Sequence, residues 1–254
     1  MLEEQIAYQD LPSEEEIAGW EASKGKRSFN GIGNLFRQYS QYLLMKKWEA
    51  EYDFKNALEV PFDHATDGID GNVFSIPHTA VLNADELCAD DAITHMQEID
   101  ANSYEFVWNF GFLQREPYFI VQMARISQKY VAAFTPNYTN PGTIAHKMYH
   151  SLYGDVCVHP ERGDKTFMCI EGLKSLFKNA GLKILDSGYV DIPPFPDTVV
   201  TVKEFFSGST TRGVLKIPVN VKGLLPFERI GYPRRVIAHH CYVLGVKRSQ
   251  KGAV

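Results

Sequence analysis

Residues 104–137 hold two apolar segments with an amphipathic segment between them, and this pattern restricts the fold more than any other in the chain. Phe106-Val107-Trp108 is a short apolar run of strand type, and Tyr130–Phe134 is a second one. Between them, Pro117 opens a segment with apolar residues at helical spacing, namely Phe119, Ile120, Met123 and Ala124. Two parallel strands of one sheet need such a crossover, which is right-handed in nearly all proteins. The segment therefore predicts an open α/β sheet.

The polar residues that follow these strands are the first candidates for a site. Open α/β sheets bind ligands beyond the carboxyl ends of their strands. Asn109 lies just past the first of the two strands, and Thr135-Pro136-Asn137 ends the second. Asn109 is therefore a candidate site residue on position alone.

The rest of the chain predicts further elements of the same kind. Ser13 and Glu16 have the spacing of a helix cap, and Gly181 lies where an amphipathic helix around Leu173–Ala180 should stop. We expect a helical segment over residues 1–55 and a Rossmann-like domain over 56–254, with a small cap insertion at about 138–166. The expected helices and strands are Asn34–Trp48, Ala57–Val60, Thr79–Asn83, Ile144–Tyr153, Lys183–Val190 and His239–Lys247.

Composition and charge weigh against several classes of function. The 254 residues carry 26 basic and 31 acidic side chains, a net charge of −5, which favours no nucleic-acid partner. No apolar run approaches the roughly 20 residues of a membrane helix, and the acidic N-terminus is not a signal peptide. The four cysteines, Cys88, Cys157, Cys169 and Cys241, lack metal-ligand spacing. We therefore expect a cytoplasmic protein with reduced thiols and no structural metal.

Several motifs in this order resemble those of class I S-adenosylmethionine-dependent methyltransferases. Ala57-Leu58-Glu59-Val60 stands in place of the family's first strand, which reads like VLEVGCGTG. The run from Tyr104 to Gln114 is similar to the family's fourth strand, which reads like FDLVWNxGVLEH. The pattern of helix, GLK and strand at Gly172–Val190 also matches, and the closing strand of the family inserts antiparallel. The resemblance covers residues 34 to 247 and implies a mostly parallel sheet with an antiparallel last strand.

The chain departs from the family at two places. The glycine-rich loop after the first strand is replaced by Pro61-Phe62-Asp63-His64-Ala65, although Gly68 and Gly71 offer a displaced turn. The segment between Val60 and Phe106 is also too short for two full helix–strand units. Val81–Asp85 matches the second strand of the family, with Asn83 or Asp85 as the ribose-binding residue, or the third strand, with Asp85 beside the adenine.

The resemblance implies roles for specific residues. Because the region after the fifth strand often caps the substrate in this family, substrate contacts are expected at Asn137, Tyr138, His159 and Arg162, where Arg162 offers a fork for a carboxylate or phosphate. A general base is expected among His146, His150 and Glu161. Residues expected to bind the cofactor, S-adenosylmethionine, are Glu59, Pro61, Asp63, Gly68, Asn83, Asp85, Asn109, Phe110 and Gly111.

The sequence therefore leaves two hypotheses for function. The first is a methyltransferase that acts on a small molecule, since the cap is short and the charge is mildly acidic. The second is an inactive relative that serves as a regulatory or scaffolding subunit in a homo- or hetero-oligomer, because the glycine-rich loop is missing. A Rossmann dehydrogenase is disfavoured because no GxGxxG follows a strand.

Overall fold

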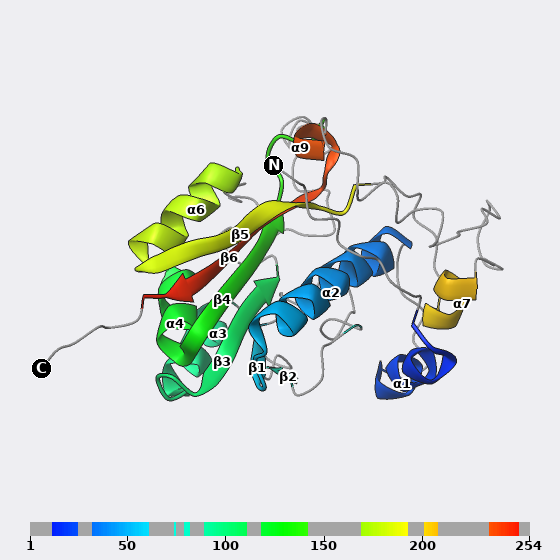
Figure 1. Ribbon diagram of the computed structural model, residues 1–254, viewed down its shortest axis with the longest axis horizontal. Helices are drawn as coiled ribbons and strands as arrows, with labels where there is room; N and C mark the ends of the chain where they lie inside the picture. Colours follow the sequence, from blue (N-terminus) through cyan, green and yellow to red (C-terminus); the bar gives the residue numbers. More distant parts are fainter. Residues whose placement is uncertain are drawn as a thin grey trace, which may run out of the picture. The chain divides into compact units, whose positions relative to one another are not determined.

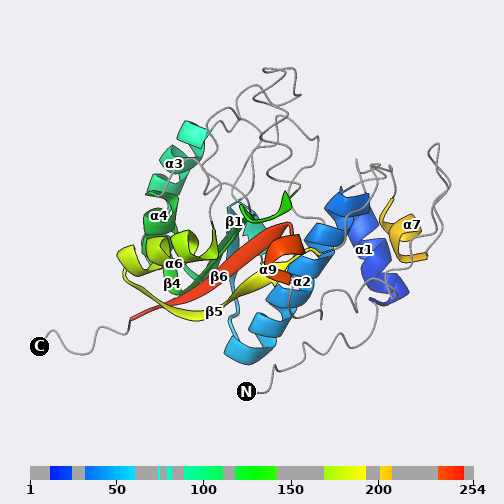
Figure 2. The ribbon, with the colours of Figure 1, turned by 90° about the horizontal axis from the view of Figure 1, so that it is seen from above.

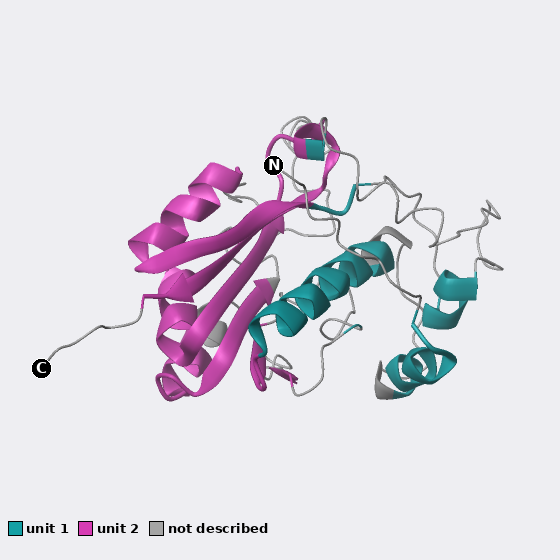
Figure 3. Cartoon of the chain, viewed as in Figure 1, with its two compact units in different colours: residues 1–53, 72–76, 190–234 teal, residues 54–71, 77–189, 235–254 magenta. Residues whose placement is uncertain are grey.

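The computed structural model describes residues 12–24, 32–60, 74, 79–81, 89–110, 118–141, 169–192, 201–207 and 234–248. The chain divides into two compact units (Figure 3). Unit 1 comprises residues 1–53, 72–76 and 190–234, and unit 2 comprises residues 54–71, 77–189 and 235–254. The boundary that we expect near residue 55 stays a prediction.

Unit 2 is built on a sheet that has six strands among the described residues, in the order β2-β1-β3-β4-β6-β5 (Figure 1). Neighbouring strands among β1 to β4 pair in parallel, whereas β6 lies between β4 and β5 and runs antiparallel to β4. The expected open, mostly parallel α/β sheet with an antiparallel last strand is confirmed. The strands are β1 (Ala57–Val60), β2 (Thr79–Val81), β3 (Tyr104–Phe110), β4 (Ser127–Pro136), β5 (Leu182–Val190) and β6 (His240–Lys247).

Three helices cover one face of this sheet: α3 (Ala89–Glu98), α4 (Tyr118–Ile126) and α6 (Ile170–Asn179), as Figure 2 shows. Side chains alternate along a strand, so every second residue of each strand reaches this face. The apolar core beneath the helices includes Leu58, Val107, Val131 and Val243 from the strands. From α4 it includes Phe119, Ile120, Met123 and Ala124, the residues whose spacing predicts the crossover helix. The crossover prediction is therefore confirmed.

The opposite face of the sheet is aromatic. Phe54 stacks on Phe106, with ring centroids 4.5 Å apart. Further along the strands, the ring of Phe134 lies edge-on to that of Trp108, with centroids 6.4 Å apart. The centroid of the Tyr242 ring is 6.0 Å from that of Phe134. These large side chains are all buried, so both faces of the central strands are covered. Such burial is typical of parallel sheets and explains the continuous apolar runs of the sequence.

An arginine at the end of α4 joins two of the helices that cover this face of the sheet. The two terminal nitrogens of Arg125 donate to the backbone carbonyls of Ile99, at 2.7 Å, and Met96, at 2.5 Å. Its Nε also donates to Gln122 at 2.8 Å. Carbonyls near the end of a helix have no partner within the helix, and a cation there is favourable. Arg125 thus stabilises the end of α3.

Two glycines near β5 and β6 have different physical roles. Gly181 ends α6 with φ +80, the left-handed conformation that favours glycine, so the predicted stop is confirmed. Gly245 in β6 allows α6 to pack closely, because a Cβ there would lie 2.7 Å from Cδ1 of Phe177 and 3.2 Å from Cβ of Leu182.

Unit 1 contains α1 (Glu14–Lys24), α2 (Ile32–Tyr52) and the short helix α7 (Val202–Ser207). The predicted cap of α1 is present: the Ser13 amide donates to Glu16 at 2.9 Å, and the Glu16 amide donates to Ser13 Oγ at 3.2 Å. An aromatic cluster forms the interior of the unit and consists of Trp20, Tyr39, Tyr42, Phe74, Phe205 and Phe206.

Helix α2 also buries polar side chains. Gln38, Ser40 and Gln41 are all at most 3% exposed. Neither the nitrogen nor the oxygen of the Gln41 amide has a hydrogen-bond partner in the part of the chain that the structure describes. A buried amide without a partner costs free energy, so Gln41 lowers the stability of the unit.

Some elements differ in extent from the predictions or lie outside the described residues. Helix α2 is longer than Asn34–Trp48, β2 is described only for Thr79–Val81, and α3 has no counterpart among the predicted elements. The expected helix at 144–153 and nearly all of the cap lie outside the described residues. Within the described ranges, no helix is both long and apolar enough to cross a membrane.

Candidate functional site at the carboxyl ends of the first and third strands

The order of the strands reverses at β1 and β3. The chain goes from β1 to β2 on one side and continues from β3 to β4 on the other. In doubly wound sheets, such a reversal creates a crevice beyond the carboxyl ends of the two central strands, where ligands bind. Val60 of β1 pairs with Asn109 of β3, so both strands end at the same edge. The topology therefore selects this edge as the candidate site.

The side chain of Asn109 is part of the framework of this edge. It is fully buried, and its amide nitrogen donates to the backbone carbonyl of Val60 at 2.9 Å. The hydrogen bond fixes the last peptide group of β1 against β3, immediately before Pro61 begins the altered loop. Asn109 therefore positions the start of that loop, a role that the sequence alone did not indicate.

Glu59 and Trp108 form a buried polar pair on the opposite face of the sheet. They are register partners on β1 and β3, so their side chains lie side by side. Glu59 is 1% exposed and Trp108 is fully buried. The next residue in the row is the small Ala132 of β4. A carboxylate is rarely buried unless its surroundings favour it, so this position is chemically specialised.

The indole of Trp108 adds a donor to this pair. Its Nε1 is buried, and within the described residues no acceptor receives its hydrogen. Indole nitrogen can only donate, whereas an ionised carboxylate can only accept. The pair therefore suits a polar group that both donates and accepts, such as a hydroxyl, or a zwitterion that presents both charges.

Two predicted substrate residues follow β4, and the structure gives them different surroundings. Asn137 is 1% exposed, and its amide nitrogen donates to the carbonyls of Arg235, at 2.8 Å, and Ala238, at 2.9 Å. Its side-chain oxygen accepts from the backbone amide of Thr139 at 3.2 Å. Tyr138 is 44% exposed. Tyr138 is thus partly exposed to solvent, whereas the amide of Asn137 is engaged with backbone.

Asn137, Thr139 and Asn140 form what we term the β4 clamp. It holds the short helix α9 (Arg234–Ile237) at the start of β6, through Arg235 and the residues that follow it. Besides the Asn137 bonds, Thr139 Oγ1 donates to the Arg235 carbonyl at 2.7 Å, and Asn140 donates to the Ile237 carbonyl at 2.8 Å. The sequence signal for the clamp is the concentration of turn residues in Thr-Pro-Asn-Tyr-Thr-Asn-Pro.

The other predicted site residues lie outside the part of the chain that the structure describes, and their roles stay predictions. Phe110 is described only in its backbone, which forms the last residue of β3. Strand β2 lies beside β1 on the side away from β3, which is the second-strand position of doubly wound sheets. The predicted site residues outside the described part of the chain are Pro61, Asp63, Gly68, Asn83, Asp85, Gly111, His146, His150, His159, Glu161 and Arg162.

The described side chains include no group of three or more His, Cys, Asp or Glu residues arranged to hold a metal ion. The two described cysteines are both free. Burial raises the pKa of Cys241 to about 12, with a smaller contribution from Cys169. Cys241 is therefore a neutral thiol at physiological pH and a poor nucleophile.

Comparison with known proteins gives structural matches only. No family model matches the sequence, and no curated protein matches it. The chain is similar to a methyltransferase of Thermotoga maritima described as a possible histamine N-methyltransferase, with 12% identity over 92% of this chain and 96% of the other and a TM-score of 0.47. It is also similar to magnesium protoporphyrin IX methyltransferase of Synechocystis with bound S-adenosylhomocysteine, with 10% identity, 92% and 95% coverage and a TM-score of 0.47.

A methyltransferase of Archaeoglobus fulgidus is a third similar structure, with 12% identity, 84% and 98% coverage and a TM-score of 0.40. The Thermotoga and Archaeoglobus proteins are described as S-adenosylmethionine-dependent methyltransferases, the family that the sequence motifs resemble. Identities of 10–12% give no residue of this chain a role.

Proposed function

We propose that the protein is an S-adenosylmethionine-dependent methyltransferase that acts on a small molecule. The observation that carries the proposal is the buried pair of Glu59 and Trp108 at the strand-order reversal. The pair offers an acceptor and a donor side by side, where doubly wound sheets bind nucleotide-like ligands. S-adenosylmethionine has hydroxyl groups and a zwitterionic amino acid moiety, so its chemistry fits this pair.

When bound, S-adenosylmethionine supplies an electrophilic methyl group. The protein therefore has to hold and align the reactants and remove a proton from the acceptor. Glu59 and Trp108 hold polar groups of the cofactor, and Asn109 fixes the strand end from which the altered loop begins. His146, His150 or Glu161 accepts the proton of the methyl acceptor.

Calorimetric titration with S-adenosylhomocysteine tests the cofactor site. We expect micromolar binding to the wild type and at least a tenfold loss in Glu59→Gln, which removes the charge but keeps the shape. The matched control is Glu105→Gln at the opposite end of β3, where the carboxylate accepts from the Lys55 amide. Its affinity should equal that of the wild type.

The inactive relative is the alternative outcome of this titration. No heat at protein concentrations well above micromolar would reject the methyltransferase and favour a regulatory or scaffolding subunit. Equal losses in Glu59→Gln and Glu105→Gln would instead move the cofactor site away from the Glu59–Trp108 pair. Asp63→Ala, which changes the altered loop, should also weaken binding.

A further inference from the structure

Arg235 is an exposed arginine whose backbone is held by the β4 clamp. Its carbonyl accepts two hydrogen bonds, from Asn137 Nδ2 at 2.8 Å and from Thr139 Oγ1 at 2.7 Å. At this edge of the sheet, Pro136, the last residue of β4, pairs with His240, the first residue of β6. A flexible side chain on a fixed backbone therefore starts from the carboxyl edge of the sheet.

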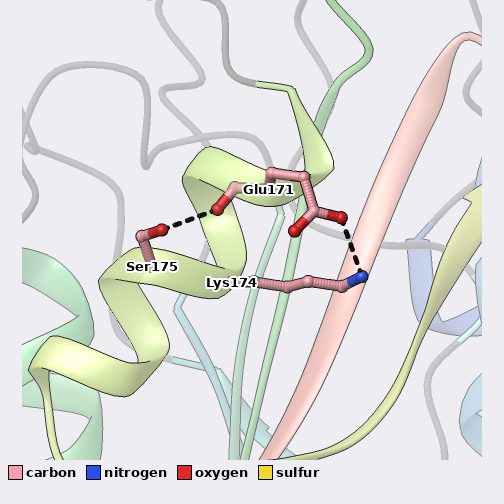
Figure 4. Close-up of polar contacts among 3 residues, drawn as sticks. All are labelled: Glu171, Lys174 and Ser175. Atoms are coloured by element: carbon pink, nitrogen blue, oxygen red, sulfur yellow. Dashed lines mark hydrogen bonds and ion pairs between the residues drawn. The ribbon is translucent and has the colours of Figure 1, made fainter.

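No carboxylate of the described residues forms an ion pair with the Arg235 guanidinium. The described acid whose charge acts on Tyr189 is Glu171, at the start of α6. Its carboxylate is 3.1 Å from Lys174 Nζ, and its carbonyl accepts from Ser175 Oγ at 2.9 Å (Figure 4). Lys174 thus pairs with Glu171, whereas Arg235 has no ion-pair partner among the described residues.

Tyr189 is the last residue but one of β5, and Tyr138 follows β4. Burial raises the pKa of Tyr189, and the positive charge of Arg235 acts against that rise. Tyr138 lies between two clamp residues and is 44% exposed. A guanidinium that has no ion-pair partner in the described part of the chain, on a backbone held beside the exposed Tyr138, suits a ligand with both an anionic group and an apolar ring or chain.

We propose that Arg235 binds a carboxylate or phosphate group of the methyl acceptor and so selects anionic small molecules as substrates. This inference rests on the proposed methyltransferase function, because it treats the carboxyl edge of β4 as the acceptor side of the site. The guanidinium forms a two-bond fork with the anion, and Tyr138 covers the apolar part of the acceptor.

The test uses full-length protein saturated with S-adenosylhomocysteine and three probes: benzoate, phenyl phosphate and the neutral benzamide. Binding is followed by saturation-transfer NMR. We expect benzoate or phenyl phosphate to bind the wild type in the millimolar range or tighter, and to lose at least tenfold in Arg235→Gln. Benzamide should bind both proteins equally. Arg235→Lys, which keeps the charge without the fork, should lose less.

Arg248→Gln is the matched control, since Arg248 is an exposed arginine just beyond the other end of β6. Its affinity for all three probes should stay at the wild-type value. The inference is overturned if neither anion binds the wild type, or if Arg235→Gln binds the anions as tightly as the wild type does. It is also overturned if Arg248→Gln loses as much anion affinity as Arg235→Gln. Preference for benzoate over phenyl phosphate, or the reverse, identifies the type of anion.

Failure of the two proposals can be told apart. Titration with S-adenosylhomocysteine alone reports on the methyltransferase proposal, and Arg235→Gln should leave that affinity unchanged. A second case is that S-adenosylhomocysteine does not bind, and that Arg235→Gln still loses anion binding when the compound is absent. The anion site then stands, and the methyltransferase assignment falls. Thermal unfolding of each variant verifies that it is folded.

Discussion

The side-chain amide of Asn109 donates to the backbone carbonyl of Val60 across 2.9 Å and thereby ties the end of β1 to β3. Asn109→Asp removes this donor and sets a carboxylate oxygen against a carbonyl oxygen. We expect the free energy of unfolding to fall by about 2–3 kcal/mol and S-adenosylhomocysteine to bind more weakly. Urea unfolding and calorimetric titration measure the two effects.

The same substitution at Asn102 is a control for which we expect no loss of stability. Asn102 Oδ1 accepts from Lys247 Nζ at 2.7 Å, so Asn102→Asp keeps the acceptor and adds a charge opposite the ammonium group. Its stability should be equal to or above that of the wild type. If both variants lose equal stability, the Asn109–Val60 bond has no special role.

Gln41→Leu should stabilise the protein. Both polar atoms of the fully buried Gln41 amide have no hydrogen-bond partner in the described part of the chain, and leucine removes this cost at similar volume. We expect the free energy of unfolding to rise by about 1–2 kcal/mol. Gln38→Leu is the control, because Gln38 is buried on the same helix but does make interactions. A destabilised Gln41→Leu would mean that the amide has a partner in the native protein.

Gly245→Ala should destabilise the protein by about 1–3 kcal/mol, because the added methyl group would overlap the ring of Phe177. The combination with Phe177→Leu should cost less than the sum of the two single variants, since the smaller side chain makes room. Gly19→Ala in α1 has open space around it and should instead gain about 1 kcal/mol. Additive losses at positions 245 and 177 would contradict the close packing of α6 on β6.

Stability should fall at alkaline pH. Burial raises the pKa of Tyr42 to about 12, with contributions from Glu16 and Glu49, and the pKa of Tyr39 also rises, chiefly through burial. A raised pKa means that the folded protein keeps protons that the unfolded chain has lost. The stabilisation is therefore complete below the unfolded pKa near 10 and is lost as the pH rises towards 12.

Urea unfolding at pH 8 to 11 measures this dependence. Each proton of difference contributes a slope of about 1.4 kcal/mol per pH unit. Tyr42→Phe should have a shallower slope than the wild type above pH 10. An unchanged slope in Tyr42→Phe would show that its phenol ionises freely in the folded protein.

The sequence predicted the sheet well because its strands are marked by apolar runs and proline or glycine boundaries. Ala57–Val60 was located to the residue, and the crossover from β3 to β4 followed from the spacing of Phe119, Ile120 and Met123. Helix α3 was missed because its sequence, ADDAITHMQE, has few apolar residues. Its end is instead stabilised by Arg125, a contact that depends on the fold and has no local signal.

The site was predictable only in part. Asn109 became a candidate because it follows a predicted strand. Its bond to Val60, however, depends on strand pairing that a single sequence does not specify. The β4 clamp likewise joins Asn137 to Arg235, residues almost a hundred positions apart. Residues 198–236 contain no strong periodic pattern, and for this reason Arg235 was not a candidate before the structure placed its carbonyl in the clamp.

The position of β6 between β4 and β5 has a consequence for synthesis of the protein. Strand β5 ends at Val190 and β6 starts at His240, yet among the described strands β5 neighbours only β6. While the ribosome adds the residues between them, β5 lacks this partner strand, and the edge of β4 that β6 later covers stays open. The last part of the sheet therefore forms after translation of residue 247, and a nascent chain halted before that point would be prone to aggregate through these two strands.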